Sequence, residues 1–357
     1  MKKDRIPIFI LVNDIHIDKQ RSELVKGIFK QIFRISVEIG VSDIAIGGDV
    51  FTDRSGQPLD CLLTFPDIVD MADKFDKTIH VIPGNHDKTD PNDYRSYIDV
   101  YKDSRLLKIH REGCTLVIGG CIISFVPYFG DAKWMEEFSK ARQQRNYLSK
   151  HPNIDHSKPS FLITHVAING VRNNDGSEVV CDLKSSMFDD YTKVFVGHYH
   201  NASQIGKNIY YTGSAYQKDF GENITDKGCT IVYNDGSHEF VPLKFPKHIK
   251  HVIDIDDTET LRNLLEKYDG EDYDIIKFVF RGKKVDVNKI NQSDIAARGI
   301  QCEFESIEEK EAIDNAVDSD ALNYDKRSIT KDFLKFCSEN SIRGERMKFG
   351  LNLIKSL

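Results

Sequence analysis

Val194-Phe195-Val196-Gly197-His198-Tyr199-His200 is the stretch that decides the fold of this 357-residue chain. Its β-branched and aromatic residues predict a buried strand that ends at Gly197. Two histidines two residues apart follow at once, and in an extended segment that spacing places both imidazoles on one side of the backbone. Imidazole is the commonest protein ligand for transition metals. Taken alone, the pair is equally well explained as two surface histidines.

Four earlier apolar runs end in side chains of the same kind. They are 7–12, which leads into Asp14 and His16; 43–46, which leads into Gly47-Gly48-Asp49; 78–82, which leads into Pro83-Gly84-Asn85-His86-Asp87; and 161–164, which leads into His165. In open α/β sheets, ligands bind outside the carboxyl ends of the strands. We therefore expect these side chains to meet at one edge of a sheet.

Helices are expected between these strands, because apolar residues recur there at helical spacing. The expected ranges are 23–38, 60–75 and 134–148. Pro66 lies inside the second range and predicts a kink or a break, since proline cannot donate the i→i−4 hydrogen bond. Gly119-Gly120 predicts a hairpin between strands at 116–118 and 122–127.

The composition of the chain changes after Pro246 and predicts several units. Residues 1–246 form the first domain, and 247–305 alternate strand and helix as a small βαβαβ domain. Residues 306–325 are rich in acid and predict a linker or a mobile helix. Residues 326–357 predict a helical tail with two apolar stripes, which consist of Ile329, Phe333, Phe336 and Cys337, and of Met347, Leu351 and Ile354.

Composition also excludes several classes of protein. No apolar run approaches the ~20 residues of a membrane helix, and no signal-peptide pattern is present. The seven cysteines include no CxxC pair, which argues against a disulfide framework and against a thiolate zinc site. We expect a cytoplasmic protein with no membrane contact. The net charge of −7 argues against a broadly basic surface that binds nucleic acid, although it permits a local basic groove.

The polar side chains at the strand ends form a candidate metal site. The expected ligands are Asp14, His16, Asp49, Asn85, His165, His198 and His200. Nitrogen and oxygen donors without sulfur suit Mn²⁺, Fe²⁺ or Zn²⁺. Seven ligands are too many for one ion and fit two ions that share one carboxylate. Two ions about 3.5–4 Å apart can clamp both oxygens of an in-line phosphoryl displacement.

The order of these blocks resembles the calcineurin-like metallophosphoesterases. The blocks are Asp-x-His, Gly-Gly-Asp, Gly-Asn-His-Asp, a strand-terminal His and Gly-His-x-His. Within that superfamily the chain is most similar to the SbcD-type DNA repair nucleases of bacteria and phages. Gly48-Asp49-Val50-Phe51 carries that similarity, as do Tyr211-Thr212-Gly213-Ser214 and Asp219-Phe220-Gly221-Glu222.

The resemblance implies a fold and a role for each site residue. The fold would be an α/β four-layer αββα sandwich. Asp14, His16 and His200 would hold one metal ion, Asn85, His165 and His198 the other, and Asp49 would bridge them. His86 would be catalytic without being a ligand, since it would stabilise the transition state or protonate the leaving 3′ oxygen. Thr52 departs from the pattern, because many relatives carry histidine or aspartate there.

The leading functional hypothesis is a DNA exonuclease and endonuclease that uses two divalent ions, with Mn²⁺ expected. It would act in DNA repair or recombination as a homodimer, with an SbcC-type coiled-coil ATPase bound to the tail. The alternative is a small-molecule phosphodiesterase or a phosphoprotein phosphatase of the same superfamily, since Gly48 to Arg54 loosely resembles a phosphatase block. A third hypothesis is a binding subunit with a vestigial site.

Overall fold

The computed structural model describes residues 5–173, 177–268, 274–283 and 290–306, together with a few isolated positions beyond 332. Apart from Ser306 and those isolated positions, the predicted acidic linker (306–325) and helical tail (326–357) lie outside the described residues. Within the described residues, no helix is both long enough and apolar enough to cross a membrane.

Two six-stranded sheets form the large part of the molecule. The first contains β1 (Pro7–Val12), β2 (Asp43–Ile46), β3 (Thr78–Val81), β4 (Leu107–Ile109), β11 (Gly228–Tyr233) and β12 (His238–Pro242). Their order across the sheet is β12-β11-β1-β2-β3-β4. Neighbours from β1 to β4 are parallel, while β11 pairs antiparallel with both β1 and β12.

The second sheet also has six strands. It contains β5 (Cys114–Ile118), β6 (Cys121–Val126), β7 (Ser160–His165), β8 (Lys193–Gly197), β9 (Ser203–Ile205) and β10 (Ile209–Tyr211). Their order is β5-β6-β7-β8-β10-β9, with a parallel centre and an antiparallel strand at each edge. The predicted hairpin is confirmed, and Gly119 and Gly120 supply its turn with φ of +56° and +77°.

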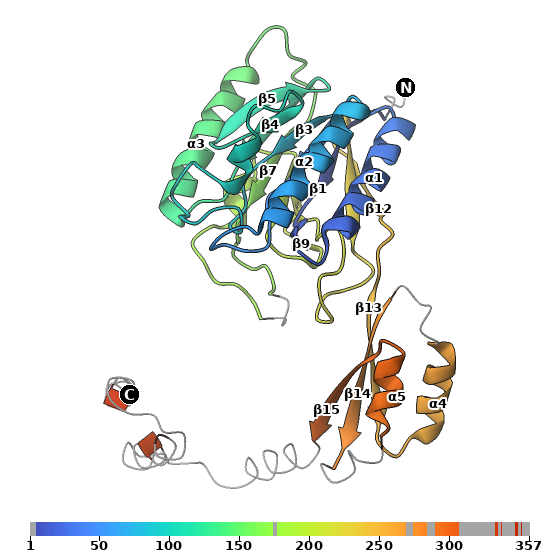
Figure 1. Ribbon diagram of the computed structural model, residues 1–357. Helices are drawn as coiled ribbons and strands as arrows, with labels where there is room; N and C mark the ends of the chain where they lie inside the picture. Colours follow the sequence, from blue (N-terminus) through green and yellow to red (C-terminus); the bar gives the residue numbers. More distant parts are fainter. Residues whose placement is uncertain are drawn as a thin grey trace.

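Helices cover the outer faces of the two sheets (Figure 1). α1 (Ser22–Glu38) and α2 (Leu59–Lys74) pack on the first sheet, and α3 (Asp131–Leu148) packs on the second. Successive side chains of β1 point to opposite faces, so Ile10 packs beneath the helices and Phe9 packs between the sheets. The predicted α/β four-layer αββα sandwich is therefore confirmed.

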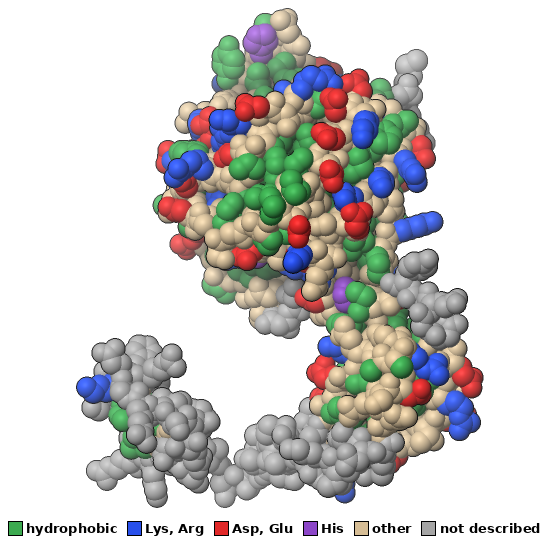
Figure 2. Space-filling model, in the orientation of Figure 1, with side chains coloured by type: hydrophobic (Ala, Val, Ile, Leu, Met, Phe, Trp, Pro, Cys, Tyr) green, Lys and Arg blue, Asp and Glu red, His purple; other side chains and the backbone are tan. Residues whose placement is uncertain are grey.

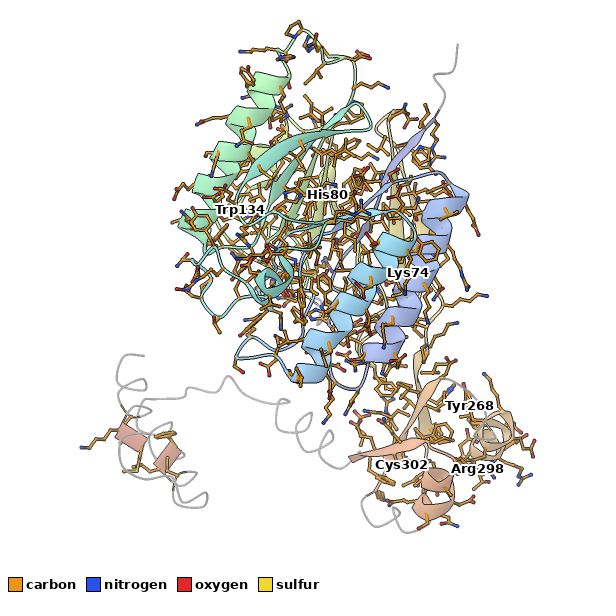
Figure 3. The ribbon with its side chains drawn as sticks, turned by 45° about the horizontal axis from the view of Figure 1, so that its top comes forward. Lys74, His80, Trp134, Tyr268, Arg298 and Cys302 are labelled. Atoms are coloured by element: carbon orange, nitrogen blue, oxygen red, sulfur yellow. The ribbon has the colours of Figure 1, made fainter. Side chains whose placement is uncertain are left out.

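Trp134 anchors α3 on the second sheet. Its side chain is fully buried, and its Nε1 donates to Thr164 Oγ1 of β7 at 3.1 Å. Figure 3 shows Trp134 on this helix and His80 within the sandwich. The bond satisfies the one polar atom of a large buried ring, so α3 has a fixed position over β7.

A third sheet lies outside the sandwich, and it has the predicted βαβαβ order. It consists of β13 (His248–Asp254), α4 (Thr258–Lys267), β14 (Ile275–Gly282), α5 (Gln292–Ala297) and β15 (Gln301–Ser306). All three strands are parallel and share a separate apolar cluster. Figure 3 labels Tyr268, Arg298 and Cys302 in this unit. The domain boundary at residue 246 stays a prediction.

The sequence predicted a kink or a break at Pro66, and the break does not occur, since α2 continues from Leu59 to Lys74. Proline leaves the carbonyl of residue i−4 without its helical donor. Here that carbonyl belongs to Leu62, and it accepts a hydrogen bond from the Tyr101 hydroxyl at 2.5 Å. Tyr101 ends the short 3₁₀ helix η1 (Tyr97–Tyr101). A side chain distant in sequence therefore replaces the donor that proline lacks.

We predict that Tyr101→Phe lowers the free energy of unfolding by about 1–3 kcal/mol, because it leaves the partly buried Leu62 carbonyl without a partner. Urea unfolding followed by circular dichroism measures the change. In a Pro66→Ala background the alanine N–H can reach that carbonyl, so the same substitution should cost less. An equal loss in both backgrounds would mean that the hydroxyl does not compensate for the proline.

Candidate metal centre

All the predicted ligands lie where parallel strands end at the same edge of the sandwich. Asp14 and His16 follow β1, Asp49 follows β2, and Asn85 follows β3. From the second sheet, His165 ends β7, while His198 and His200 follow β8. Two sheets packed face to face therefore bring seven side chains from five strands to one place.

One half of the cluster contains Asp14, His16 and His200. A ligand atom from each lies within 4.8 Å of the other two. His16 Nε2 and His200 Nε2 face each other at 2.9 Å. His16 Nδ1–H donates to the Phe51 carbonyl at 3.2 Å, so the Nε2 lone pair points into the cluster. A hydrogen bond of this kind on the far nitrogen is what orients a metal-binding histidine.

The other half contains His165, His198 and Asn85. Asn85 Oδ1 lies 2.9 Å from His165 Nε2 and 2.8 Å from His198 Nδ1. His165 Nδ1–H donates to the Gly47 carbonyl at 2.9 Å, which turns Nε2 inward as in His16. Three ligand atoms thus converge in this half, and the donors are an amide oxygen and two imidazoles.

Asp49 lies between the two halves. Its Oδ1 is 3.4 Å from His165 Nε2, and its Oδ2 is 3.6 Å from His16 Nε2. Only 2% of the residue is exposed. Asp14, Asp49 and His165 also form a group within 4.8 Å. The carboxylate has one oxygen for each half, which is the arrangement that a bridging ligand needs.

Burial and mutual contact set the protonation of these groups. Burial alone would raise the pKa of Asp49, but His165 and His16 hold it well below its ordinary value, so the carboxylate is ionised. Burial lowers the pKa of His165, yet the contact with Asp49 outweighs it and raises the pKa to about 9. Burial lowers the pKa of His198 to about 3 and raises that of Asp14 to about 6.

The backbone at the site is strained in four of the candidate ligands. Asp14, His16, Asp49 and His198 all have positive φ, at 51°, 49°, 52° and 93°. Such conformations cost about 1–3 kcal/mol each and persist where the surroundings fix them, often at functional sites. Gly48 makes the packing possible, because a Cβ there would lie 2.3 Å from His165 Nδ1.

Asp87 holds two ligand-bearing loops together, a role that the sequence analysis did not assign. It is fully buried and accepts hydrogen bonds from the backbone N–H groups of Val50 (3.2 Å), Phe51 (3.0 Å) and Gly84 (2.8 Å). These bonds tie the loop after β3 to the loop after β2. The sequence signal that could have revealed this role is the position of Asp87 in the Gly-Asn-His-Asp block. Asp87 has the one polar side chain of that block to which the sequence analysis assigned no role.

Glu222 orients His200, and sequence analysis missed this role as well. Its Oε1 accepts a hydrogen bond from His200 Nδ1 at 2.5 Å. Its Oε2 pairs with the buried Lys227 at 3.1 Å and accepts from the Lys218 N–H at 3.0 Å. A carboxylate behind a metal-binding histidine fixes the ring and raises its basicity. Glu222 lies in the block at 219–222 that resembles the nuclease subgroup.

His86 lies beside the cluster, and its imidazole is not one of the converging ligands. Its backbone N–H donates to Asp49 Oδ1 at 2.8 Å, and its ring Nδ1–H donates to the Thr52 carbonyl at 2.5 Å. Nε2 then faces the site, 4.0 Å from Asp49 Oδ2. Burial lowers the pKa of His86. Thr52 itself contributes only its carbonyl here, and its buried hydroxyl has no hydrogen-bond partner.

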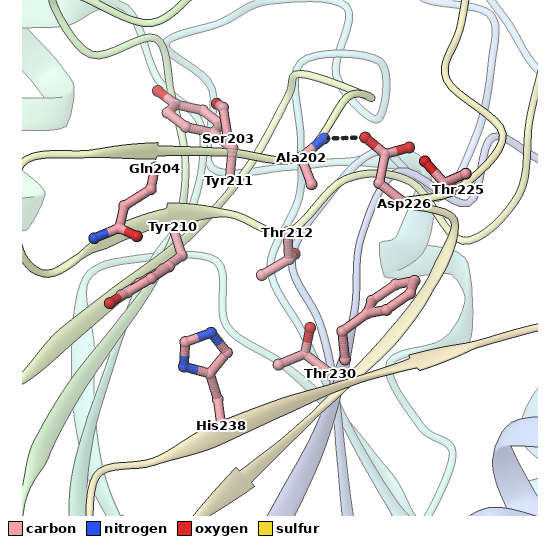
Figure 4. A pocket seen from close by; sticks show the side chains of 11 residues that line it. Ala202, Ser203, Gln204, Tyr210, Tyr211, Thr212, Thr225, Asp226, Thr230 and His238 are labelled. Atoms are coloured by element: carbon pink, nitrogen blue, oxygen red, sulfur yellow. Dashed lines mark hydrogen bonds between the residues drawn. The ribbon is translucent and has the colours of Figure 1, made fainter.

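A separate pocket of about 330 Å³ is lined by residues from Ala202 to Phe240 (Figure 4). Its walls come from β9, β10, β11 and β12 and include Tyr210, His238 and Phe240. At one end Asp226 accepts a hydrogen bond from the Ala202 N–H at 2.7 Å. None of the predicted ligands lines this pocket, so it is distinct from the metal site.

The arrangement predicts that Glu222→Gln weakens metal binding about 10–100-fold, as loss of a hydrogen-bonding partner behind a ligand generally does. Glutamine keeps the size of the side chain and removes the charge that orients His200. Titration calorimetry with Mn²⁺ measures the effect. Glu239→Gln, on an exposed edge strand, is the matched control. Unchanged affinity in Glu222→Gln would show that the imidazole is oriented without this carboxylate.

Comparison with known proteins supplies the family. The chain matches the family described as calcineurin-like phosphoesterase over residues 8–202, which include all seven candidate ligands and His86. No curated protein matches it. One solved structure that is similar is titled "New Structure Of Cold-Active Protein Tyrosine Phosphatase At 1.1 Angstrom"; it is 13% identical, with 66% of this chain and 78% of that chain covered and a TM-score of 0.28. This chain belongs to the calcineurin-like phosphoesterases, a family of metal-dependent hydrolases of phosphoester bonds.

Proposed function

We propose that this protein is a DNA phosphodiester hydrolase of the SbcD type that uses two divalent ions, with both exonuclease and endonuclease activity. One observation carries the proposal beyond the family. The 219–222 block, which resembles the nuclease subgroup, supplies Glu222 to His200 inside the site. A block on which the resemblance rests therefore contacts a candidate metal ligand, and this contact supports the proposal.

The residues present fit two divalent ions. Asp14, His16 and His200 would hold one, Asn85, His165 and His198 the other, and Asp49 lies where it could contact both. Four of these donors are imidazoles, which favours Mn²⁺ over Mg²⁺. When bound, the ions supply Lewis-acid charge at the phosphoryl oxygens and lower the pKa of water.

The chain's own groups bind and orient the phosphodiester and move a proton. The backbone of the Asp49 and Asn85 loops is locked by Asp87, so the ligands keep their geometry without the substrate. Two cations, Arg54 and Lys218, lie close enough to the site to affect the pKa of His86. They attract the phosphate backbone. In this proposal His86, in its protonated form, gives the leaving oxygen a proton from Nε2, while the Thr52 carbonyl accepts a hydrogen bond from Nδ1–H.

The alternative is a phosphoprotein phosphatase or a small-molecule phosphodiesterase on the same site. The stretch at 48–54 resembles a phosphatase block only loosely, so it gives this alternative little support. The unit built from β13 to β15 favours the nuclease, because it is joined to the loop that carries Glu222. Gln217 accepts a hydrogen bond from the His248 N–H at 2.7 Å, and its amide donates to the Glu222 carbonyl at 3.0 Å. A hydrolase of small esters has no evident need of that attachment.

We also propose two partners. A second copy of the chain would cover the face on which α2 lies, where Figure 2 shows hydrophobic side chains gathered. On α2 and η1 the exposed fractions of Leu59, Leu63 and Val100 are 68%, 58% and 67%. Sedimentation of the wild type against Leu63→Glu tests the homodimer.

An SbcC-type coiled-coil ATPase would bind residues 326–357, and co-purification with and without that segment tests it.

Linear DNA, bis-p-nitrophenyl phosphate and a phosphopeptide, assayed side by side, test the function. We predict that a chelator abolishes hydrolysis and that Mn²⁺ restores it better than Mg²⁺, because imidazole ligands suit Mn²⁺. DNA should be the best substrate. Preference for the phosphopeptide would favour the phosphatase, and full activity in chelator would contradict the metal site.

Two substitutions separate catalysis from metal binding. His86→Ala removes a proton donor without removing a ligand, so turnover should fall about 10²–10⁴-fold while both ions still bind. Asp49→Ala removes the carboxylate between the two halves and should lower metal occupancy as well. Elemental analysis beside the DNA assay measures both effects. A metal-free His86→Ala and a fully loaded Asp49→Ala would reverse the two roles.

A further inference from the structure

A chain of hydrogen bonds outside the metal centre joins a cysteine to a carboxylate. Cys114 Sγ lies 3.3 Å from His110 Nδ1, and His110 Nε2 lies 3.1 Å from His80 Nδ1. His80 Nε2 in turn lies 3.0 Å from Asp43 Oδ1. None of these four side chains is a candidate metal ligand. A nucleophile in contact with a base, which a further group orients, is the arrangement that activates nucleophilic side chains.

The protons of this chain all point toward the carboxylate when both imidazoles are neutral. A carboxylate only accepts hydrogen bonds, so His80 carries its proton on Nε2 and accepts at Nδ1. His110 then carries its proton on Nε2 and accepts at Nδ1, which makes the Cys114 S–H the donor to that nitrogen. The basic nitrogen of His110 is therefore directed at the thiol.

Both sheets contribute to this chain. Asp43 begins β2, His80 lies on β3 and His110 follows β4, all in the first sheet. Cys114 begins β5 of the second sheet and is paired with Phe125 across the hairpin. The Phe125 ring stacks on both imidazoles, with centroids 4.2 Å from His110 and 5.6 Å from His80. Only 1% of Phe125 is exposed, so a fixed ring holds the two imidazoles in place.

A pocket of about 580 Å³ gives access to the thiol. Its lining consists of Cys114, His110, Tyr94, Ile109, Arg111, Glu112 and Leu116. Arg111 forms an ion pair with Asp99, and Glu112 forms one with Lys140. Because the charged side chains of the lining are already paired, the pocket suits an uncharged molecule with an apolar part.

Cys114 and His110 rest as a thiol and a neutral imidazole. Burial raises the pKa of Cys114 to about 12, while Glu112, Lys140 and Glu137 act on it more weakly. Burial lowers the pKa of His110 to about 3. Thiolate is therefore scarce at neutral pH, and Cys114 can attack only if its proton leaves as the new bond forms. A base in contact with the thiol meets that requirement.

We propose that Cys114 is a modification site that hydroperoxides oxidise to the sulfenic acid, with His110 as the group that moves the proton. The sulfur forms a bond to the terminal oxygen of the hydroperoxide, and the O–O bond breaks. The thiol proton moves to His110 Nδ1 and from there to the leaving oxygen, which departs as an alcohol. The thiol is oxidised and the hydroperoxide is reduced, so the step needs no further reactant. His80 and Asp43 stabilise the charge that His110 carries between the two transfers.

A hydroperoxide is the electrophile that suits this arrangement. Its leaving oxygen is strongly basic and must take up a proton, which the imidazolium of His110 supplies. The pocket is larger than hydrogen peroxide requires, and Ile109 and Leu116 offer apolar contacts to an alkyl group. The proposal goes beyond the phosphoesterase function and does not depend on it.

A metal ion does not suit this cluster. His110 directs Nδ1 at Cys114 and Nε2 at His80, so the thiol and the second imidazole lie at opposite nitrogens of one ring. Among the described residues, no third ligand atom joins Cys114 and His110 in a group that could hold an ion. Structural zinc sites need four ligands.

The pH dependence of oxidation in the full-length wild type tests the proposal. tert-Butyl hydroperoxide is the oxidant, dimedone traps the sulfenic acid, and mass spectrometry measures it at each cysteine. The imidazole is ready to accept a proton throughout, so the rate at Cys114 should change less than about twofold between about pH 6 and 8.5. At Cys181, which is also partly exposed and donates to the Ala167 carbonyl, the rate should rise with pH, because only hydroxide removes that proton.

A rise of about tenfold per pH unit at Cys114 would mean that free thiolate alone reacts, and it would overturn the inference. This measurement needs no substitution and no phosphoester, so it stands whatever the phosphoesterase assays show.

His110→Gln tests the base directly. Glutamine can accept a hydrogen bond from the thiol but does not take up its proton, so oxidation of Cys114 at neutral pH should fall about 10²-fold. Oxidation of Cys181 should stay the same. Lys108→Gln, at an exposed position of β4, is the matched control and should leave Cys114 unchanged. An unchanged rate in His110→Gln, or an equal fall at Cys181, would overturn the role of His110.

Discussion

The rest of the site depends on one buried carboxylate, that of Asp49. It has no salt-bridge partner of fixed positive charge among the described residues, and its neighbours are three imidazoles and the His86 N–H. A charge buried in this way is costly unless the surroundings compensate for it. Imidazoles can do so by carrying protons, and divalent ions can do so more strongly. The two packed sheets place an imidazole near each oxygen of Asp49, that of His165 near Oδ1 and that of His16 near Oδ2.

The fold places the groups that compensate for the buried Asp49 carboxylate at the ends of its strands. Parallel strands from both sheets finish at one edge. In the loops after β1, β2 and β8 the chain turns through residues with positive φ, which are Asp14, His16, Gly48, Asp49 and His198. The glycines at 48 and 84 are needed because a Cβ at either would lie within 2.3 Å of His165 Nδ1 or Asp49 Oδ1. Asp87 then joins the two loops of the first sheet, and Glu222 fixes His200. The strain in the ligand backbone is thus balanced by hydrogen bonds from residues that touch no ligand atom in the cluster.

The sequence predicted the strands and the side chains at their ends, because continuous apolar runs and the polar residues that stop them are local signals. It also predicted the hairpin at Gly119-Gly120, since the turn conformation is local too. The break that it allowed at Pro66 does not occur, because Tyr101, thirty-five positions away, supplies the donor that Pro66 lacks. Glu222 and Asp87 were missed for the same reason, because their tasks follow from contacts that only the packed sandwich creates.

Arg54 shows why composition alone could not describe this site. Its sequence position, close to Thr52 where relatives often carry an acid or a histidine, suggested only that a second acid–base group was missing. In the structure the Arg54 guanidinium contacts His86 directly, with Nη2 3.3 Å from Nε2. Arginine stays protonated at all relevant pH values, so it cannot replace a lost acid or base. What it can do is bind an anion through its forked N–H donors. Beside Thr52 the chain therefore offers a cation that can contact an anion, next to the proposed proton donor His86.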